Sequence, residues 1–180
     1  MPYTYVYLAG IGNSGPKHWQ RLWQEQQGGL WVQHDYWDAP VASQWVEDLD
    51  KAVSGAKQPV ILIAHSLGAL VAAQWLNQGG QAAAAYLVAV PDVDGPQFPK
   101  EAGGFVSART LNIDIPARVI ASHDDPFGSH AHAFDAAQRW KASFWAVGHK
   151  GHINAASGMG AWPEGWQDLQ KFMNGATREP

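Results

Sequence analysis

The chain has 180 residues, of which 16 are acidic and 12 basic, and a formal net charge of −4, so we do not expect a nucleic-acid partner. It has no cysteine, which excludes disulfides and thiolate metal sites, and no apolar run near the ~20 residues that cross a bilayer, so we expect no membrane association. The hydrophobic content of 46% is enough to bury a core, and we expect one domain over residues 1–180.

The chain opens with a strand and a glycine-rich loop. Residues 3–8 are mostly aromatic or branched and predict a strand. Because no basic head or long apolar stretch precedes them, we expect no signal peptide and a cytoplasmic location. Residues 9–16 then contain three glycines. A phosphate-binding loop would end in Gly-Lys-Ser/Thr, whereas this one ends in Gly15-Pro16-Lys17, so we expect no nucleotide and no other cofactor.

Strand-like and helix-like segments alternate along the rest of the chain. Helices are predicted from Pro16 to Gly28, from a cap at Ser43, around residues 70–75 with a stop at Gly79-Gly80, and over residues 131–140 and 165–173. Further strands are predicted over residues 30–34, 60–63, 83–90, 117–121 and 143–147. Residues 91–110 form a long irregular segment of the kind that is often functional. The alternation predicts a three-layer α/β/α fold with about six mostly parallel strands and helices on both faces.

The most informative stretch joins a buried strand to a helix at residues 60–75. Residues 60–63 are branched and apolar, as in a strand buried on both faces of a parallel sheet. The pentapeptide AHSLG follows at residues 64–68 and leads directly into an apolar helix. Strand, small-x-Ser-x-small turn and helix together predict a nucleophile elbow, in which Ser66 is exposed at the tip of a strained turn.

A serine hydroxyl needs a base within hydrogen-bond reach to act as a nucleophile. We expect that base after the last strand, where both His149 and His152 stand. His152 is preferred because Gly151 before it lets the backbone turn the imidazole toward Ser66. His149 remains the alternative.

The base in turn needs a carboxylate that orients it. Asp125 follows the predicted fifth strand and precedes Pro126, which restrains it to an extended conformation. We therefore predict Asp125 as the acid and expect its neighbour Asp124 to cap the turn or face solvent. Asp92 and Asp94, after the fourth strand, are the competing positions.

The negative charge that develops on the substrate also needs hydrogen-bond donors. The backbone N–H of Leu67, at the start of the elbow helix, is one candidate. The backbone N–H of Ile11, in the loop after the first strand, is the second. If the first strand neighbours the elbow strand, Gly10 and Gly12 allow this loop to approach Ser66 closely.

Four strings resemble a known family: GIGNSGPKHWQ at residues 10–20, HSLG at 65–68, DDPF at 124–127 and GH at 151–152. Together they closely resemble the small serine hydrolases typified by YdeN and the retinoblastoma-binding protein nine, from about residue 3 to residue 173. The resemblance implies a minimal α/β hydrolase without a lid domain, in which Ser66, His152 and Asp125 form the catalytic triad. It also implies a carboxylesterase that cleaves small ester substrates. Without a lid, we expect short acyl chains.

Two other readings compete with this one. His130 and His132 have the spacing of a strand-borne metal pair, but they start a predicted helix, where residues two apart do not share a face. Alternatively, ten tryptophans could form the binding surface of a non-catalytic protein on a hydrolase fold. Most of these tryptophans fall on apolar helix faces, where core packing is the simpler explanation.

Overall fold

A computed structural model describes residues 3–176 and contains one six-stranded sheet. The strands are β1 (Thr4–Leu8), β2 (Leu30–Trp31), β3 (Val60–His65), β4 (Ala84–Val88), β5 (Ala117–Ala121) and β6 (Ser143–Ala146). They lie in the order β2-β1-β3-β4-β5-β6 and every neighbouring pair is parallel. From β1, the chain adds β2 on one side of that strand and β3 on the other. The remaining strands then follow β3 in sequence order toward the opposite edge of the sheet. The reversal between β1 and β3 is where open α/β sheets bind their ligands.

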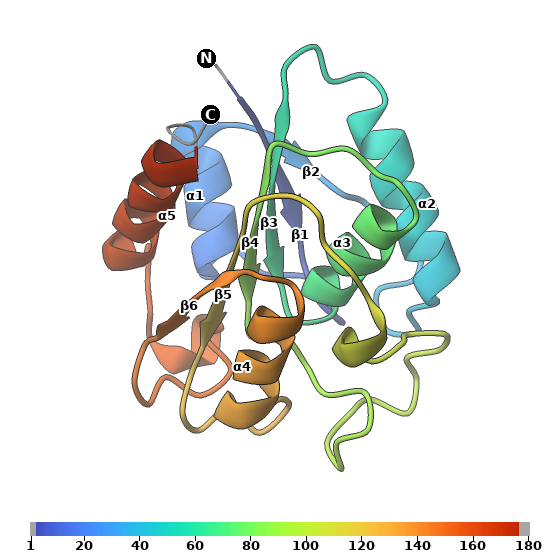
Figure 1. The fold of residues 1–180 in the computed structure, drawn as a ribbon, viewed down its shortest axis with the longest axis vertical. Coiled ribbons are helices and arrows are strands. Elements are labelled where there is room, and N and C mark those ends of the chain that lie inside the picture. Colours follow the sequence, from blue (N-terminus) through green and yellow to red (C-terminus); the bar gives the residue numbers. More distant parts are fainter. Residues whose placement is uncertain (1–2, 177–180) are drawn as a thin grey trace.

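Five α-helices cover the sheet on both faces, as Figure 1 shows. They are α1 (Trp19–Gln27), α2 (Ala42–Val53), α3 (Leu67–Asn77), α4 (His130–Arg139) and α5 (Pro163–Ala176). The buried side chains of α2, α3 and α4 share one core cluster, and those of α1 and α5 share another on the opposite face. The three-layer α/β/α prediction is therefore confirmed. Among residues 3–176, no helix combines the length and apolar character needed to cross a bilayer.

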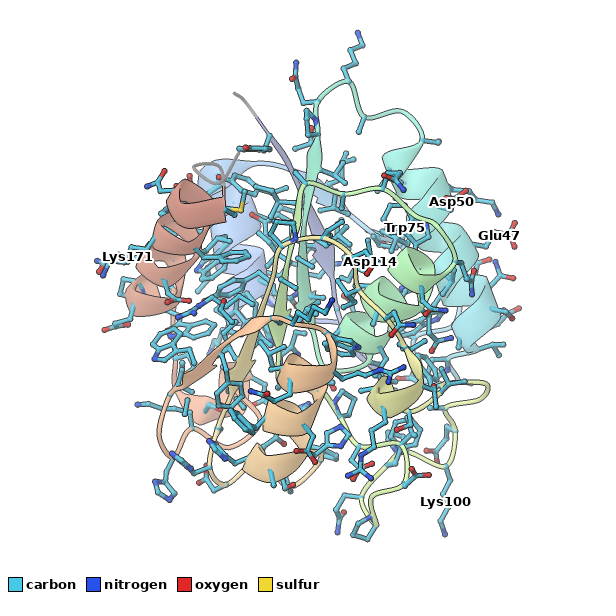
Figure 2. The ribbon with its side chains drawn as sticks, in the orientation of Figure 1. Glu47, Asp50, Trp75, Lys100, Asp114 and Lys171 are labelled. Atoms are coloured by element: carbon cyan, nitrogen blue, oxygen red, sulfur yellow. The ribbon has the colours of Figure 1, made fainter. Side chains whose placement is uncertain are left out.

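The tryptophans are mainly core residues. The five on predicted helix faces are at most 5% exposed: Trp19, Trp23, Trp45, Trp75 and Trp140. Trp75 on α3 also donates its indole N–H to the carboxylate of Asp50 on α2, at 2.9 Å, and both residues are labelled in Figure 2. The two helices of this layer are thus joined by a polar contact as well as by packing. These side chains stabilise the fold rather than forming a binding surface.

Several predicted boundaries differ from the observed ones. Helix α1 begins at Trp19 instead of Pro16, because the side chain of His18 caps it by accepting from the N–H of Gln20. Ser43 does not cap α2, whose N-cap is Val41 without a side-chain bond. Strand β2 has only two residues, and α5 extends beyond the predicted end to Ala176. None of these differences moves a predicted site residue away from the carboxyl edge of the sheet.

The elbow helix packs against the end of β1 with almost no space between them. A Cβ atom on Gly68 would lie 2.3 Å from the carbonyl oxygen of Leu8, and one on Gly10 would lie 2.9 Å from the Cβ of Ser66. Only glycine fits such positions without a backbone shift. The small residue two positions after Ser66 is therefore required by the approach of α3 to β1, and the loop after β1 lies directly against Ser66.

We expect Gly68→Ala to destabilise the protein by about 1–3 kcal/mol, because the added methyl group overlaps the backbone of β1. Gly175→Ala is the matched control, since a Cβ there meets nothing within 4 Å and alanine favours a helix. Urea unfolding of both variants measures the difference. Equal stability of the two variants would contradict the close-packing argument.

Candidate active site

Ser66 is the residue at which β3 turns into α3. Its backbone has φ 57° and ψ −125°, a conformation that a serine adopts only under strain, and its N–H donates to the carbonyl of Val88 at 3.0 Å. The surrounding sheet holds this turn in place, because both β3 and the first ten residues of α3 are buried. The strained strand–turn–helix predicted for a nucleophile elbow is therefore present at Ser66.

The structure brings Ser66, His152 and Asp125 into one hydrogen-bonded chain. The Nε2 atom of His152 lies 2.8 Å from the Oγ of Ser66, and its Nδ1 lies 2.9 Å from each carboxylate oxygen of Asp125. Asp125 is 8% exposed and also accepts from the N–H of Phe127 at 2.9 Å. With the carboxylate ionised, Nδ1 carries the proton and Nε2 is free to accept one from the serine.

Asp124, next to Asp125, has different partners. Its Oδ1 accepts from the hydroxyl of Ser122 at 2.6 Å and from the N–H of Gly151 at 2.9 Å. Ser122 Oγ also accepts from the N–H of Lys150 at 2.8 Å. The hydrogen bond from Ser122, followed by that from Gly151, lowers the pKa of Asp124. Asp124 therefore connects the loop after β5 to the loop that carries His152. The sequence predicts only a turn cap or a solvent-facing side chain at this position.

The competing residues lie elsewhere. The ring of His149 lies 5.5 Å from that of His123, and no hydrogen bond between His149 and Ser66 is found in the described part of the chain. Asp92 lies 3.6 Å from Nδ1 of His132 and accepts from the N–H of Asp94 at 3.1 Å. Neither carboxylate contacts His152 in a hydrogen bond or ion pair recorded for the described part of the chain.

The residues of the two predicted oxyanion donors, Ile11 and Leu67, line the same cavity as Ser66. Leu67 opens α3, so its N–H lies in the first turn of the helix, where the peptide donors have no intrahelical acceptor. Ile11 follows Gly10, whose position against Ser66 is described above.

A cavity of about 220 Å³ opens above Ser66. Leu67, Pro91, Pro99 and Phe127 supply much of its apolar wall, and Pro91 and Pro99 belong to the irregular segment after β4. This segment is the yellow-green loop at the lower edge of Figure 1, and Figure 2 labels Lys100 on it. The lining residues include no aspartate, glutamate, lysine or arginine. The cavity therefore suits a small uncharged ligand.

Two buried histidines beside the triad were not identified as site residues from the sequence. His65 is 5% exposed, and its Nε2 lies 2.8 Å from the carbonyl oxygen of His152. His18 is 4% exposed and packs against His65, with ring centroids 4.8 Å apart. Burial, reinforced by neighbouring His152, lowers the pKa of His18 to about 4 and that of His65 well below its ordinary value. Their place in the sequence, before Ser66 and before α1, gave no sign that the two rings meet.

The two histidines considered as a metal pair do not share a ligand position. His130 stacks on His123 at 4.6 Å between ring centroids, whereas His132 is buried, with its Nε2 3.1 Å from the carbonyl oxygen of Pro91. Among residues 3–176, no group of three or more histidine, aspartate or glutamate side chains is arranged to hold a metal ion.

Comparison with known proteins identifies the family. The model of the serine hydrolase family matches residues 5–171. A crystal structure of a YdeN-like hydrolase from Pectobacterium atrosepticum is 32% identical, with a TM-score of 0.85 over 96% of this chain and 91% of that one. The chain belongs to the YdeN family of small serine hydrolases. It is thus a hydrolase with the minimal α/β-hydrolase fold.

Other solved structures share the fold of this YdeN-family hydrolase at lower identity. The ydeN gene product of Bacillus subtilis is 21% identical, with a TM-score of 0.77 over 97% of this chain and 100% of that one. A Pyrococcus furiosus esterase is 16% identical, with a TM-score of 0.70 over 96% and 81% of the two chains. No curated protein matches the chain.

The buried histidines predict that this YdeN-family hydrolase loses stability in acid. The pKa of His18 is about 4 in the folded protein and about 6.5 in the unfolded chain, so the unfolded chain is protonated first as the pH falls. The contribution of His18 to the free energy of unfolding is therefore complete above pH 6.5 and falls as the pH drops toward 4. For His18 alone the loss amounts to about 3 kcal/mol. Urea unfolding between pH 7.5 and 4.5 should show a steeper decline for the wild type than for His18→Asn. Parallel curves would contradict this assignment.

Proposed function

We propose that this hydrolase cleaves small carboxylic esters through a covalent acyl-enzyme. The observation that carries the proposal is the position of His152 between its two partners, 2.8 Å from Ser66 Oγ and 2.9 Å from both oxygens of Asp125. This is the arrangement in which a serine is activated by a histidine that a buried carboxylate orients.

In the first half of the reaction, the Oγ of Ser66 attacks the ester carbonyl while Nε2 of His152 takes its proton. Asp125 holds the imidazole in the tautomer that can accept this proton and stabilises the resulting imidazolium. His152 then gives the proton to the leaving alcohol as the tetrahedral intermediate collapses to the acyl-enzyme. In the second half, a water molecule repeats the sequence, with His152 as its base, and releases the acid.

The backbone N–H groups of Ile11 and Leu67 stabilise the oxyanion that forms in each half. Such donors act on charge that is absent from the ground state, so they lower the barrier by several kcal/mol. The close approach of Gly10 to Ser66 supports this role, because the loop that carries Ile11 then runs beside the serine that attacks the carbonyl. Residue identity matters less at position 11 than the backbone geometry, since the donor is a peptide group.

The cavity supports a short acyl chain. Its volume of about 220 Å³ accommodates a few carbon atoms on either side of the scissile bond, and its walls are uncharged. Thioesters and amides of similar size differ from esters only in the leaving group. The proposal is tested by measuring turnover of a panel of acetate to octanoate esters, with matched thioesters and amides. Wild type and Ser66→Ala are compared on every substrate. Absence of turnover on the whole panel, together with no labelling of Ser66 by a fluorophosphonate, would favour a non-catalytic binding protein instead.

We expect Ser66→Ala and His152→Ala each to lose more than about 10³-fold in kcat, because each removes a group on which the other depends. The double variant should be scarcely slower than either single one. His149→Ala is the matched control in the same loop and should lose much less. Initial rates on a short-chain ester measure all four variants. Multiplicative losses in the double variant, or a larger effect at His149, would contradict the assigned pairing.

The adjacent carboxylates give a second test. Asp125→Asn should fold normally and lose on the order of 10³–10⁴-fold in kcat, because the amide favours the wrong tautomer of His152. Asp124→Asn should lose roughly tenfold or less, since its side chain retains an oxygen that can accept from Gly151. Rates near pH 8, with circular dichroism as the control for folding, compare the two. Near-normal turnover of Asp125→Asn would exclude it as the acid.

A further inference from the structure

The imidazole of His18 has a defined tautomer. It caps α1 by accepting a hydrogen bond at Nδ1 from the N–H of Gln20, at 3.2 Å. A nitrogen that accepts cannot carry the proton, so the neutral ring must carry it on Nε2. Burial and the proximity of His152 lower the pKa of His18 to about 4, which keeps the ring neutral at ordinary pH. His18 thus presents an Nε2–H donor at the end of the ring opposite the cap.

This donor has no acceptor among residues 3–176. The Nε2 atom is buried and makes no hydrogen bond, and the residue as a whole is 4% exposed. Leaving a buried donor without a partner is unfavourable, and such groups in native proteins call for an explanation. His18 also lines the cavity that contains Ser66 and His152. A molecule bound in that cavity can supply the missing acceptor.

The surroundings indicate what kind of acceptor fits. The cavity is lined by no lysine or arginine, so a carboxylate or phosphate would be buried there without a fixed cation. A positive charge on His18 would also oppose the positive charge that His152 acquires during the reaction. Asn13 and Asn154, two further uncharged polar residues, line the same cavity. The acceptor that suits this environment is a neutral oxygen.

We propose that the Nε2–H of His18 donates a hydrogen bond to a second oxygen of the substrate, distinct from the scissile carbonyl. The favoured substrates are then small uncharged esters that carry an additional ether, hydroxyl or carbonyl oxygen, on either the acyl or the alcohol side. This inference rests on the proposed esterase function and narrows it to a substrate class. His18 is a specificity-determining residue in this scheme.

Isosteric substrate pairs test the proposal. On the acyl side, p-nitrophenyl methoxyacetate replaces one methylene of p-nitrophenyl butyrate by an ether oxygen. On the alcohol side, 2-methoxyethyl acetate does the same for butyl acetate. The measured quantity is the ratio of kcat/KM for the oxygen substrate to that for its methylene analogue. Comparing this ratio between variants cancels the intrinsic reactivity of the esters, and the two arms distinguish the acyl from the alcohol side.

Two variants separate the roles of the two ring nitrogens. His18→Asn keeps a side-chain oxygen that can cap α1 but removes the Nε2–H donor. His18→Gln lacks the short capping geometry but extends an amide N–H toward the position of Nε2. We expect His18→Gln to lower Tm by about 2–4 °C, as the loss of a helix cap does, and His18→Asn to lower it less.

For the ratio of kcat/KM, the expected order of the two variants is reversed, and His18→Asn should be affected more than His18→Gln. The ratio of kcat/KM should fall by about three- to tenfold in His18→Asn in at least one arm, the size of one neutral hydrogen bond. In His18→Gln it should recover at least partly. An unchanged ratio in His18→Asn in both arms would overturn the proposal. So would a ratio that follows Tm in the two variants, because His18 would then act only through α1.

Failure of the esterase proposal is recognised separately. If the wild type cleaves none of the four esters, the proposed function fails, and calorimetric binding of the same pairs to the wild type and His18→Asn tests the hydrogen bond alone. Tighter binding of the oxygen analogue to the wild type but not to His18→Asn would support the inference. Equal preference in both proteins would refute it.

Discussion

The contact between α3 and the end of β1 is the constraint on which the rest of the site depends. Gly68 lies where any side chain would meet the carbonyl of Leu8, and Gly10 lies where any side chain would meet Ser66. The same approach brings the loop after β1 beside Ser66, which itself has a positive φ. The proposed nucleophile and both proposed oxyanion donors are thus positioned by backbone packing and not by the side chains of the cavity.

The histidine side of the site is held differently, by polar contacts between two loops. Asp125 orients the His152 ring, while Asp124 and Ser122 bond the backbone at Gly151 and Lys150. Of these two neighbouring carboxylates, Asp125 therefore orients the side chain of His152, and Asp124 holds the main chain that carries it. The strands beneath, β5 and β6, contribute their carboxyl ends to the same edge of the sheet as β3, which is why the three loops meet.

The sequence predicted the features that depend on local pattern. Buried strands, the elbow at residues 64–68 and the Asp-Pro turn are each encoded within a few residues, and they were sufficient for the fold and for the Ser66, His152 and Asp125 constellation. Features that depend on contacts between distant segments were missed. The packing of His18 on His65 and the hydrogen bond from the N–H of Gly151 to Asp124 join segments whose approach only the folded sheet determines.

The position of His152 has a consequence for how activity and folding are linked. Its partner Ser66 is 86 residues away, and the loop that carries it follows β6, the edge strand whose residues are all only partly buried or exposed. Edge elements open at lower free energy than the core strands of a sheet. In the proposed mechanism, catalytic competence therefore depends on an edge strand that has no buried residue. Local opening of β6 would abolish it while the buried sheet around β3 stays intact, and a nascent chain would acquire it only after the last strand has docked.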